Sequence, residues 1–191
     1  MISNNVKTKH ASSKPHKFIL IYMIIILALI LISPLHADYI DKDKFHGEAF
    51  PCEIKIPSDW KGEEKSGSTL LVMTSPDGVT EITLRGKHYP GGASVEKIAK
   101  RDVLMYNNWI FEGARTITGT RKMVRGAEAG AIALYSKPLL GIGGTQQKII
   151  NACYYYTKGE NCYILRFRTH DTFWDDNKRT FEDILKSFKI K

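Results

Sequence analysis

Residues 146–169 read QQKIINACYYYTKGENCYILRFRT and decide the fold, because they form two strand patterns joined by a tight turn. Gly159-Glu160 is a two-residue turn with glycine first, which favours a hairpin of antiparallel strands. This turn places Thr157 opposite Cys162 and Cys153 opposite Arg166. Period-two alternation then predicts one apolar side that faces the core, made of Ile150, Ala152, Tyr154, Tyr156, Tyr163, Leu165 and Phe167.

Further strand and helix patterns lie on either side of this hairpin. Strand patterns precede it at residues 50–56, 69–74, 79–89, 115–124 and 129–136. Helical spacing of apolar residues marks two segments, at residues 95–108 with Ser94 as N-cap and at residues 173–188. Hairpins dominate, and strands do not alternate with helices. The order predicts an α+β fold with a central antiparallel sheet of about six or seven strands and helices packed on its faces.

The first part of the chain is typical of a targeting segment. Residues 18–32, FILIYMIIILALILI, contain no charge and follow a leader with four lysines. This pattern predicts a signal peptide at residues 1–37 that is cleaved between Ala37 and Asp38. An uncleaved anchor is the alternative, although the run is shorter than the about 20 apolar residues that span a bilayer. Either way the remainder is expected outside the cytoplasm, free in the periplasm or secreted, or anchored in the inner membrane.

The exported part divides into a polar, irregular lead-in at residues 38–50 and a single globular domain at residues 51–191. Its charge does not indicate a nucleic-acid partner. The formal charge of the whole chain is +8, and the four lysines of the leader supply half of it. The surplus that remains is too small to predict binding to a polyanion.

Two segments resemble known proteins. IKIPSDW at residues 54–60 ends a strand with proline and an aromatic residue, and FEDILKSFKI at residues 181–190 is an amphipathic last helix. With the order of elements between them, they resemble the PsbP-like family, which includes the PsbP subunits of photosystem II and DcrB-like proteins of the bacterial envelope. The resemblance implies an α/β/α sandwich around an antiparallel sheet and a non-enzymatic module that binds a partner.

The sequence contains no recognisable reaction centre. His46, His88 and His170 are isolated, without the close spacing of a metal-binding pair. No serine lies in a GxSxG elbow. We therefore predict no catalytic residue, no metal and no cofactor. The alternative is an envelope hydrolase or a thiol redox enzyme that uses His170 or a cysteine of the hairpin.

Three cysteines in an exported chain leave at least one thiol unpaired. The hairpin register separates Cys153 from Cys162 by four positions, about 13 Å, whereas the Cα atoms of a disulfide lie within about 7 Å. A disulfide between Cys52 and either Cys153 or Cys162 is one alternative. Three reduced thiols are the alternative, because the domain is large enough to fold without a crosslink.

Arg166 and Arg168 share one face of the second hairpin strand, and with Tyr155 they form a candidate surface for an anionic partner. The alternative is a solvated face whose arginines pair with acids from a helix. The sequence as a whole predicts an exported, non-catalytic binding or accessory module whose partner is a protein or a membrane surface. A membrane-anchored structural protein is a further alternative, and a small-molecule ligand is left unknown.

Overall fold

The computed structural model describes residues 37–107, 112–118, 123–140 and 146–191, and residues from Ala37 to Lys191 pack as one unit. The predicted signal segment lies outside the described residues, so cleavage between Ala37 and Asp38 stays a prediction. Among the described residues, neither helix is long and apolar enough to cross a membrane.

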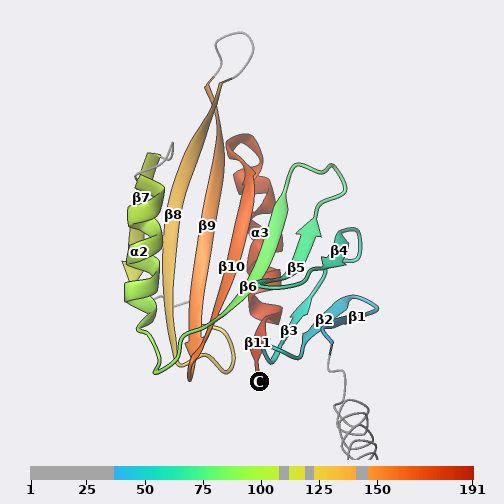
Figure 1. Ribbon diagram of the computed structural model, residues 1–191. Coiled ribbons are helices and arrows are strands. Elements are labelled where there is room, and N and C mark those ends of the chain that lie inside the picture. Colours follow the sequence, from blue (N-terminus) through green and yellow to red (C-terminus); the bar gives the residue numbers. More distant parts are fainter. Residues whose placement is uncertain (1–36, 108–111, 119–122, 141–145) are drawn as a thin grey trace, which may run out of the picture. The chain divides into compact units, whose positions relative to one another are not determined.

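The larger of two sheets has seven antiparallel strands and contains the hairpin (Figure 1). Its strand order is β4-β5-β6-β10-β9-β8-β7. The strands are β4 (Lys61–Glu64), β5 (Thr69–Thr74), β6 (Glu81–His88), β7 (Glu112–Thr118), β8 (Ala129–Leu140), β9 (Gln146–Lys158) and β10 (Asn161–His170). The predicted α+β class and the predicted sheet are therefore confirmed.

The hairpin has the register that the glycine turn predicts. Thr157 lies opposite Cys162, and Cys153 lies opposite Arg166. Gly159 has φ +57°, a conformation that glycine adopts at little cost. The turn chemistry therefore fixes which side chains of β9 and β10 share a face.

The smaller sheet corrects the prediction for residues 38–50. Its order is β1-β2-β3-β11, with β1 (Tyr39–Asp41), β2 (Lys44–Gly47), β3 (Cys52–Lys55) and β11 (Lys189–Ile190). The segment predicted as an irregular lead-in thus forms β1 and β2. Phe45 of β2 is fully buried and lies opposite Ile54. Such short strands alternate over too few residues to give a clear period-two pattern.

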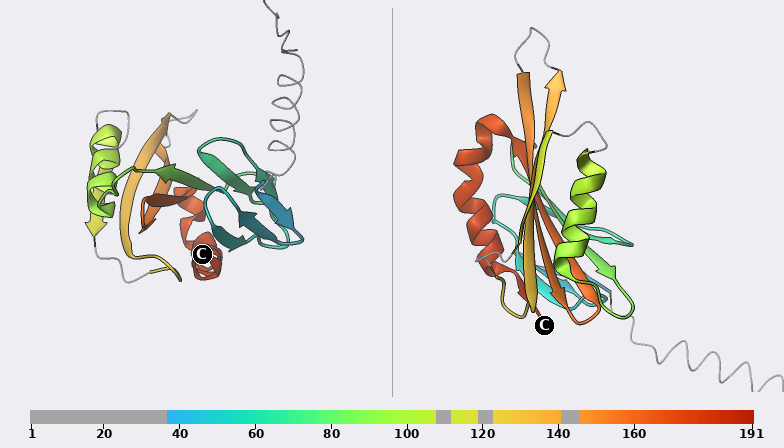
Figure 2. Two further views of the ribbon diagram at one scale, coloured as in Figure 1. Left: turned by 60° about the horizontal axis from the view of Figure 1, so that its bottom comes forward. Right: turned by 90° about the vertical axis from the view of Figure 1, so that its left-hand side faces the viewer.

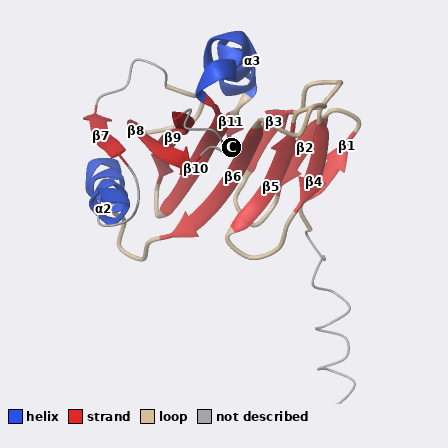
Figure 3. Cartoon of the chain, turned by 90° about the horizontal axis from the view of Figure 1, so that it is seen from above, coloured by secondary structure: helices blue, strands red, loops and turns tan. Residues whose placement is uncertain are grey.

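Two helices cover opposite faces of the seven-stranded sheet (Figures 2 and 3). Helix α2 (Val95–Asn107) packs on β7, β8 and β9. Helix α3 (Trp174–Ser187) follows a short turn, η1 (Asp171–Phe173), and packs on β3 and β10. No helix covers the α2 side of β4, β5 and β6 in Figure 3.

Each face of the sheet has its own core. On the α3 side, aromatic rings of both hairpin strands pack with the helix and the small sheet, including Tyr156, Tyr163, Phe167, Phe181 and Phe188. The core face that the alternation predicts is therefore confirmed. On the α2 side, Val95, Ile98, Ala99 and Val103 of the helix cover alanines of β8 and the opposite face of the hairpin.

The last residues of the chain close the small sheet. Ile190 lies opposite Cys52 of β3, and its backbone N–H donates to the carbonyl oxygen of Arg125 at 2.8 Å. Gly126, at φ +88°, lies so close to Ile190 that a Cβ there would overlap the Ile190 carbonyl oxygen. The loop before β8 and the chain end are thus held together by close backbone contact.

Candidate binding site beside helix α2

One face of β6 carries alternating hydrogen-bond donors toward α2. Arg85 lies opposite Ile164 and Lys87 opposite Cys162 on β10, and both β10 side chains belong to the core beneath α2. Because directly opposed residues share a face, Arg85 and Lys87 point to the α2 side of the sheet. Tyr89 follows two residues later and packs against the same core.

A pocket opens where β6 continues beyond β5. The register of the two strands ends with Thr69 opposite Arg85, and the N–H of Gly86 donates to the carbonyl oxygen of Ser68 at 2.9 Å. The pocket beside the end of β6 has a volume of about 430 Å³ and is open to solvent. Its lining residues are Phe50, Gly67, Ser68, Gly86, Lys87, His88, Tyr89 and Arg101.

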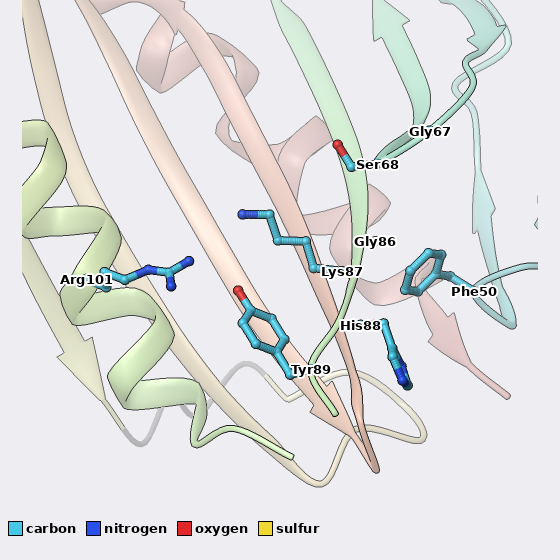
Figure 4. A pocket seen from close by; sticks show the side chains of 8 residues that line it. All are labelled: Phe50, Gly67, Ser68, Gly86, Lys87, His88, Tyr89 and Arg101. Carbon is cyan, nitrogen blue, oxygen red and sulfur yellow. The ribbon is translucent and has the colours of Figure 1, made fainter. Parts of the chain in front are cut away.

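Helix α2 brings Arg101 to this pocket. The helix begins after Ser94, whose hydroxyl accepts a hydrogen bond from the N–H of Lys97 at 3.3 Å, as expected for an N-cap. Figure 4 shows Arg101, Lys87 and Tyr89 extending toward one another from the two elements. The pocket therefore has two cations and a phenol on its α2 side.

The phenol of Tyr89 is the buried member of this group. Its oxygen is inaccessible to solvent and has no hydrogen-bond partner in the described part of the chain. Burial raises the pKa of Tyr89, and the nearby Arg101 guanidinium only partly opposes the rise. The hydroxyl thus keeps its proton at neutral pH and is a donor without an acceptor.

The nearest carboxylates have other partners. Asp102 accepts a hydrogen bond from the Tyr155 hydroxyl at 3.1 Å. Glu160 lies 3.2 Å from His88 Nε2 and accepts a hydrogen bond from the N–H of Gly91 at 2.6 Å. No ion pair found among the described residues includes Lys87 or Arg101. The two cations of the pocket are therefore not held in ion pairs, although the charge of Asp102 lies near enough to help raise the pKa of Tyr89.

The predicted anionic-partner face of Tyr155, Arg166 and Arg168 is partly wrong. Tyr155 is fully buried beneath α2, because the helix covers this part of the hairpin. Arg166 donates from Nη2 to Glu81 Oε1 at 3.0 Å, so its acid partner comes from β6 and not from a helix. Arg168 is exposed. The two arginines do share one face, which is the face of Arg85 and Lys87.

Several basic residues on this side of the molecule have no ion-pair partner among the described residues, and five of them are connected through β4, β6, β10 and the pocket. We call these five the cationic face: Lys61, Arg85, Lys87, Arg101 and Arg168. The strand registers connect them, because Lys61 lies opposite Thr74, Thr74 opposite Glu81, and Glu81 opposite Arg168. The face runs from the edge strand β4 to helix α2.

Of the two alternatives for the cysteines, the structure has the three free thiols and not a disulfide of Cys52 with Cys153 or Cys162, and all three are buried. Cys52 belongs to the core on the α3 side of the sheet, whereas the two hairpin cysteines belong to the core on the α2 side. The sheet itself separates them. Burial raises the pKa of Cys153 to about 11 and that of Cys162 to about 12. A reactive cysteine needs the opposite shift.

The remaining candidate residues do not assemble into a reaction centre. His170 Nδ1 lies 3.9 Å from Asp171 Oδ1, its neighbour in the sequence. His46 pairs with Glu53 at 3.3 Å in the small sheet, far along the chain from His170. Over the described ranges, no three histidine, cysteine or acidic side chains are grouped to hold a metal ion.

Comparison with known proteins identifies the fold. No protein-family model matches the sequence, and no curated protein gives a significant match. Among solved structures, the PsbP of the cyanobacterium Synechocystis (CyanoP) matches with a TM-score of 0.52 at 12% identity, over 84% of this chain and 96% of its own. LpqN of Mycobacterium tuberculosis, involved in cell envelope biogenesis, matches with a TM-score of 0.52 at 12% identity, over 76% of this chain and 87% of its own.

Two further structures share the fold. The Ran-binding protein Mog1p of Saccharomyces cerevisiae matches with a TM-score of 0.50 at 10% identity, over 80% of this chain and 96% of its own. A Bacteroides thetaiotaomicron protein matches with a TM-score of 0.50 at 16% identity over 80% of this chain, which spans about half (49%) of that protein's length. The fold is PsbP-like, as the resemblance implies, and these identities establish the fold alone.

The sequence holds a signal for part of this site. In Arg85-Gly-Lys-His-Tyr89 the donors occupy alternate positions of a strand pattern, so they must share a face. Arg101 could not be assigned to the same pocket, because its approach depends on how α2 packs on the sheet.

Proposed function

We propose that this PsbP-like chain is an exported binding module, without catalysis of its own, that binds an acidic protein partner on its cationic face. The proposal rests chiefly on one observation: five cations lie on one side of the molecule, and no described carboxylate pairs with them. A partner with acidic side chains complements this face, and such charge complementarity favours association and partner choice.

The surroundings of the face support a binding role. Arg168 is exposed and Arg85 and Lys87 are half-buried, so their charged ends are available at the surface while their stems pack on the sheet. Val72 and Thr74 of β5 lie between these cations on the same side and are half-buried. A mixed face of this kind, polar at its rim, is typical of a non-obligate protein interface.

Other observations favour export and a binding role without catalysis. The lysine-rich leader and the uncharged run at residues 18–32 favour export. The fold is shared with LpqN, described as involved in cell envelope biogenesis, and with Mog1p, described as Ran-binding. The buried thiols with raised pKa values and the absence of an assembled site among the described residues favour a role without catalysis.

Site-specific photo-crosslinking in the living source cell tests the partner. A crosslinker replaces Arg168 on the cationic face, and in the matched control it replaces Arg179, an exposed arginine of α3. We expect one discrete protein adduct from position 168 and none from position 179. Mass spectrometry should identify a partner with an acidic surface, and salt added before irradiation of the isolated complex should lower the yield of the adduct.

Equal crosslinking from both positions would contradict the proposed face. Binding of the purified chain to anionic vesicles alone, with no protein adduct, would assign the face to a membrane instead. Export is tested separately by mass spectrometry of the mature protein. A chain that starts at Asp38 supports signal cleavage, whereas an intact leader in the membrane fraction supports the anchor.

A further inference from the structure

The α2 side of the pocket beside β6 is composed of hydrogen-bond donors. Lys87 and Arg101 carry donors only, and the protonated Tyr89 hydroxyl is oriented with them (Figure 4). The Tyr89 oxygen is buried without a partner. A buried hydroxyl that lacks an acceptor destabilises the fold. An acceptor from outside the described chain would satisfy this hydroxyl.

Two nearby acids do not fill this role. Asp102 is next to Arg101 in the sequence, and the Tyr155 hydroxyl donates to its Oδ2 at 3.1 Å. Glu160 contacts His88 and the N–H of Gly91 through its two oxygens. Neither acid forms an ion pair with Lys87 or Arg101 among the described residues, so the donors of both cations are available to an external anion.

We infer that this pocket is an oxyanion site that takes a phosphate-class dianion, held by Lys87, Arg101 and the Tyr89 hydroxyl. Two unpaired cations match two negative charges. A tetrahedral anion offers separate oxygens to donors that approach from β6 and from α2, and the guanidinium can bind two of them at once. The pocket volume of about 430 Å³ and its open side leave room for a group attached to the phosphate.

Access to the tyrosine requires only side-chain movement. Figure 4 shows the Lys87 and Arg101 side chains extending from β6 and from α2 toward the ring of Tyr89. Both side chains are long and rotatable, so an entering anion can separate them and reach the hydroxyl. This inference stands apart from the proposed protein partner, because a small anion fits the pocket with or without one.

Calorimetric titration of the purified chain with inorganic phosphate, at mildly alkaline pH and about 0.1 M salt, tests the site. We expect one phosphate per chain for the unaltered protein. Arg101→Gln and Tyr89→Phe should each weaken binding at least about tenfold, since each removes a hydrogen bond to a charged group. Acetate, a single-charged carboxylate, should bind more weakly than phosphate.

Arg168→Gln is the matched control, because it removes the same charge from the same face. Arg168 lies six residues along β10 from Cys162, the neighbour of Lys87, which is about 20 Å. That separation exceeds the screening length of about 10 Å at moderate salt, so its phosphate affinity should change less than about twofold. An equal loss in Arg101→Gln and Arg168→Gln would show non-specific attraction and overturn the site.

Tyr89→Phe separates a binding role from a structural one. Removing a buried, unpartnered hydroxyl should leave the apo protein equally stable or more stable in thermal unfolding. Phosphate should then no longer raise the unfolding temperature as it does in the unaltered protein. A destabilised apo variant that keeps its phosphate affinity would contradict the inference.

Vesicle sedimentation distinguishes the two sources of the phosphate group. Vesicles of phosphatidylcholine with phosphatidic acid present a phosphomonoester headgroup. Vesicles of phosphatidylcholine alone present none. Binding to phosphatidic acid that free phosphate displaces assigns the site to a headgroup, and phosphate binding without vesicle binding assigns it to a soluble anion. Failure of both probes overturns the inference but leaves the crosslinking test of the protein partner unaffected.

Discussion

Cys153 lies opposite Arg166, four positions out of register with Cys162, although the two cysteines belong to one hairpin. Both thiols are buried in the core beneath α2, and Cys52 is buried on the other side of the sheet. The three thiols therefore have no geometry for pairing with one another.

We predict that all three thiols react slowly with iodoacetamide in the native protein. Burial raises the pKa of Cys52 to about 12, and those of the hairpin cysteines are raised for the same reason. Little thiolate is then present at mildly alkaline pH, and access is blocked. Mass spectrometry should show three alkylations after unfolding in guanidinium chloride and close to none before it. Rapid native labelling, or a mass lower by two hydrogens, would refute this.

Gly126→Ala should destabilise the fold strongly. The residue has φ +88°, and an added Cβ would overlap the carbonyl oxygen of Ile190. Backbone strain and overpacking together cost about 2–5 kcal/mol of unfolding free energy. Gly67→Ala is the matched control, since Gly67 has φ +78° but open space around it. It should cost only the strain, about 1–2 kcal/mol. If urea unfolding shows the same loss of unfolding free energy in both variants, the close contact with Ile190 does not contribute to the effect.

Tyr155→Phe should lower the unfolding free energy by about 1–2 kcal/mol, because it leaves the Asp102 carboxylate without the hydroxyl that donates to it at 3.1 Å. Tyr39→Phe is a suitable control, since Tyr39 is 46% exposed and its loss of a hydroxyl should have little effect. Amide hydrogen exchange in α2 should accelerate in the Tyr155 variant alone, because the bond ties the helix to β9. Unchanged exchange would contradict that tie.

Acid should weaken the small sheet through Glu53. The pKa of Glu53 is lowered from its ordinary 4.5, first by the hydrogen bond from Lys191 at 2.8 Å and further by His46. A carboxylate with a lowered pKa in the folded state contributes stability above its unfolded pKa, and this contribution is lost as pH falls through the folded value. Unfolding free energy should therefore drop below about pH 4.5. In Glu53→Gln that part of the pH dependence should disappear.

The hairpin and the class of fold could be predicted because local rules determine them. Gly159 fixes the turn, the turn fixes the register, and alternation then assigns Tyr156 and Phe167 to the core face. Strands β1, β2, β4 and β11 have two to four residues each. Their alternation is too short to recognise, and their pairing depends on partners far away in the chain.

The site was harder to predict than the fold for a related reason. A strand pattern shows which side chains share a face, but not whether a helix covers that face. Alternation therefore assigns Tyr155 to a surface, whereas α2 buries it. The same helix places Arg101 in the pocket with Lys87 and Tyr89, and this arrangement depends on tertiary packing.

The contact of β11 with β3 has a consequence for the order of folding. Ile190 lies opposite Cys52, so the small sheet joins segments that are far apart in the sequence. Pairing between distant segments costs more loop-closure entropy than pairing between neighbours and slows folding. We therefore expect the hairpin of β9 and β10, whose strands are joined by a two-residue turn, to form before the small sheet closes.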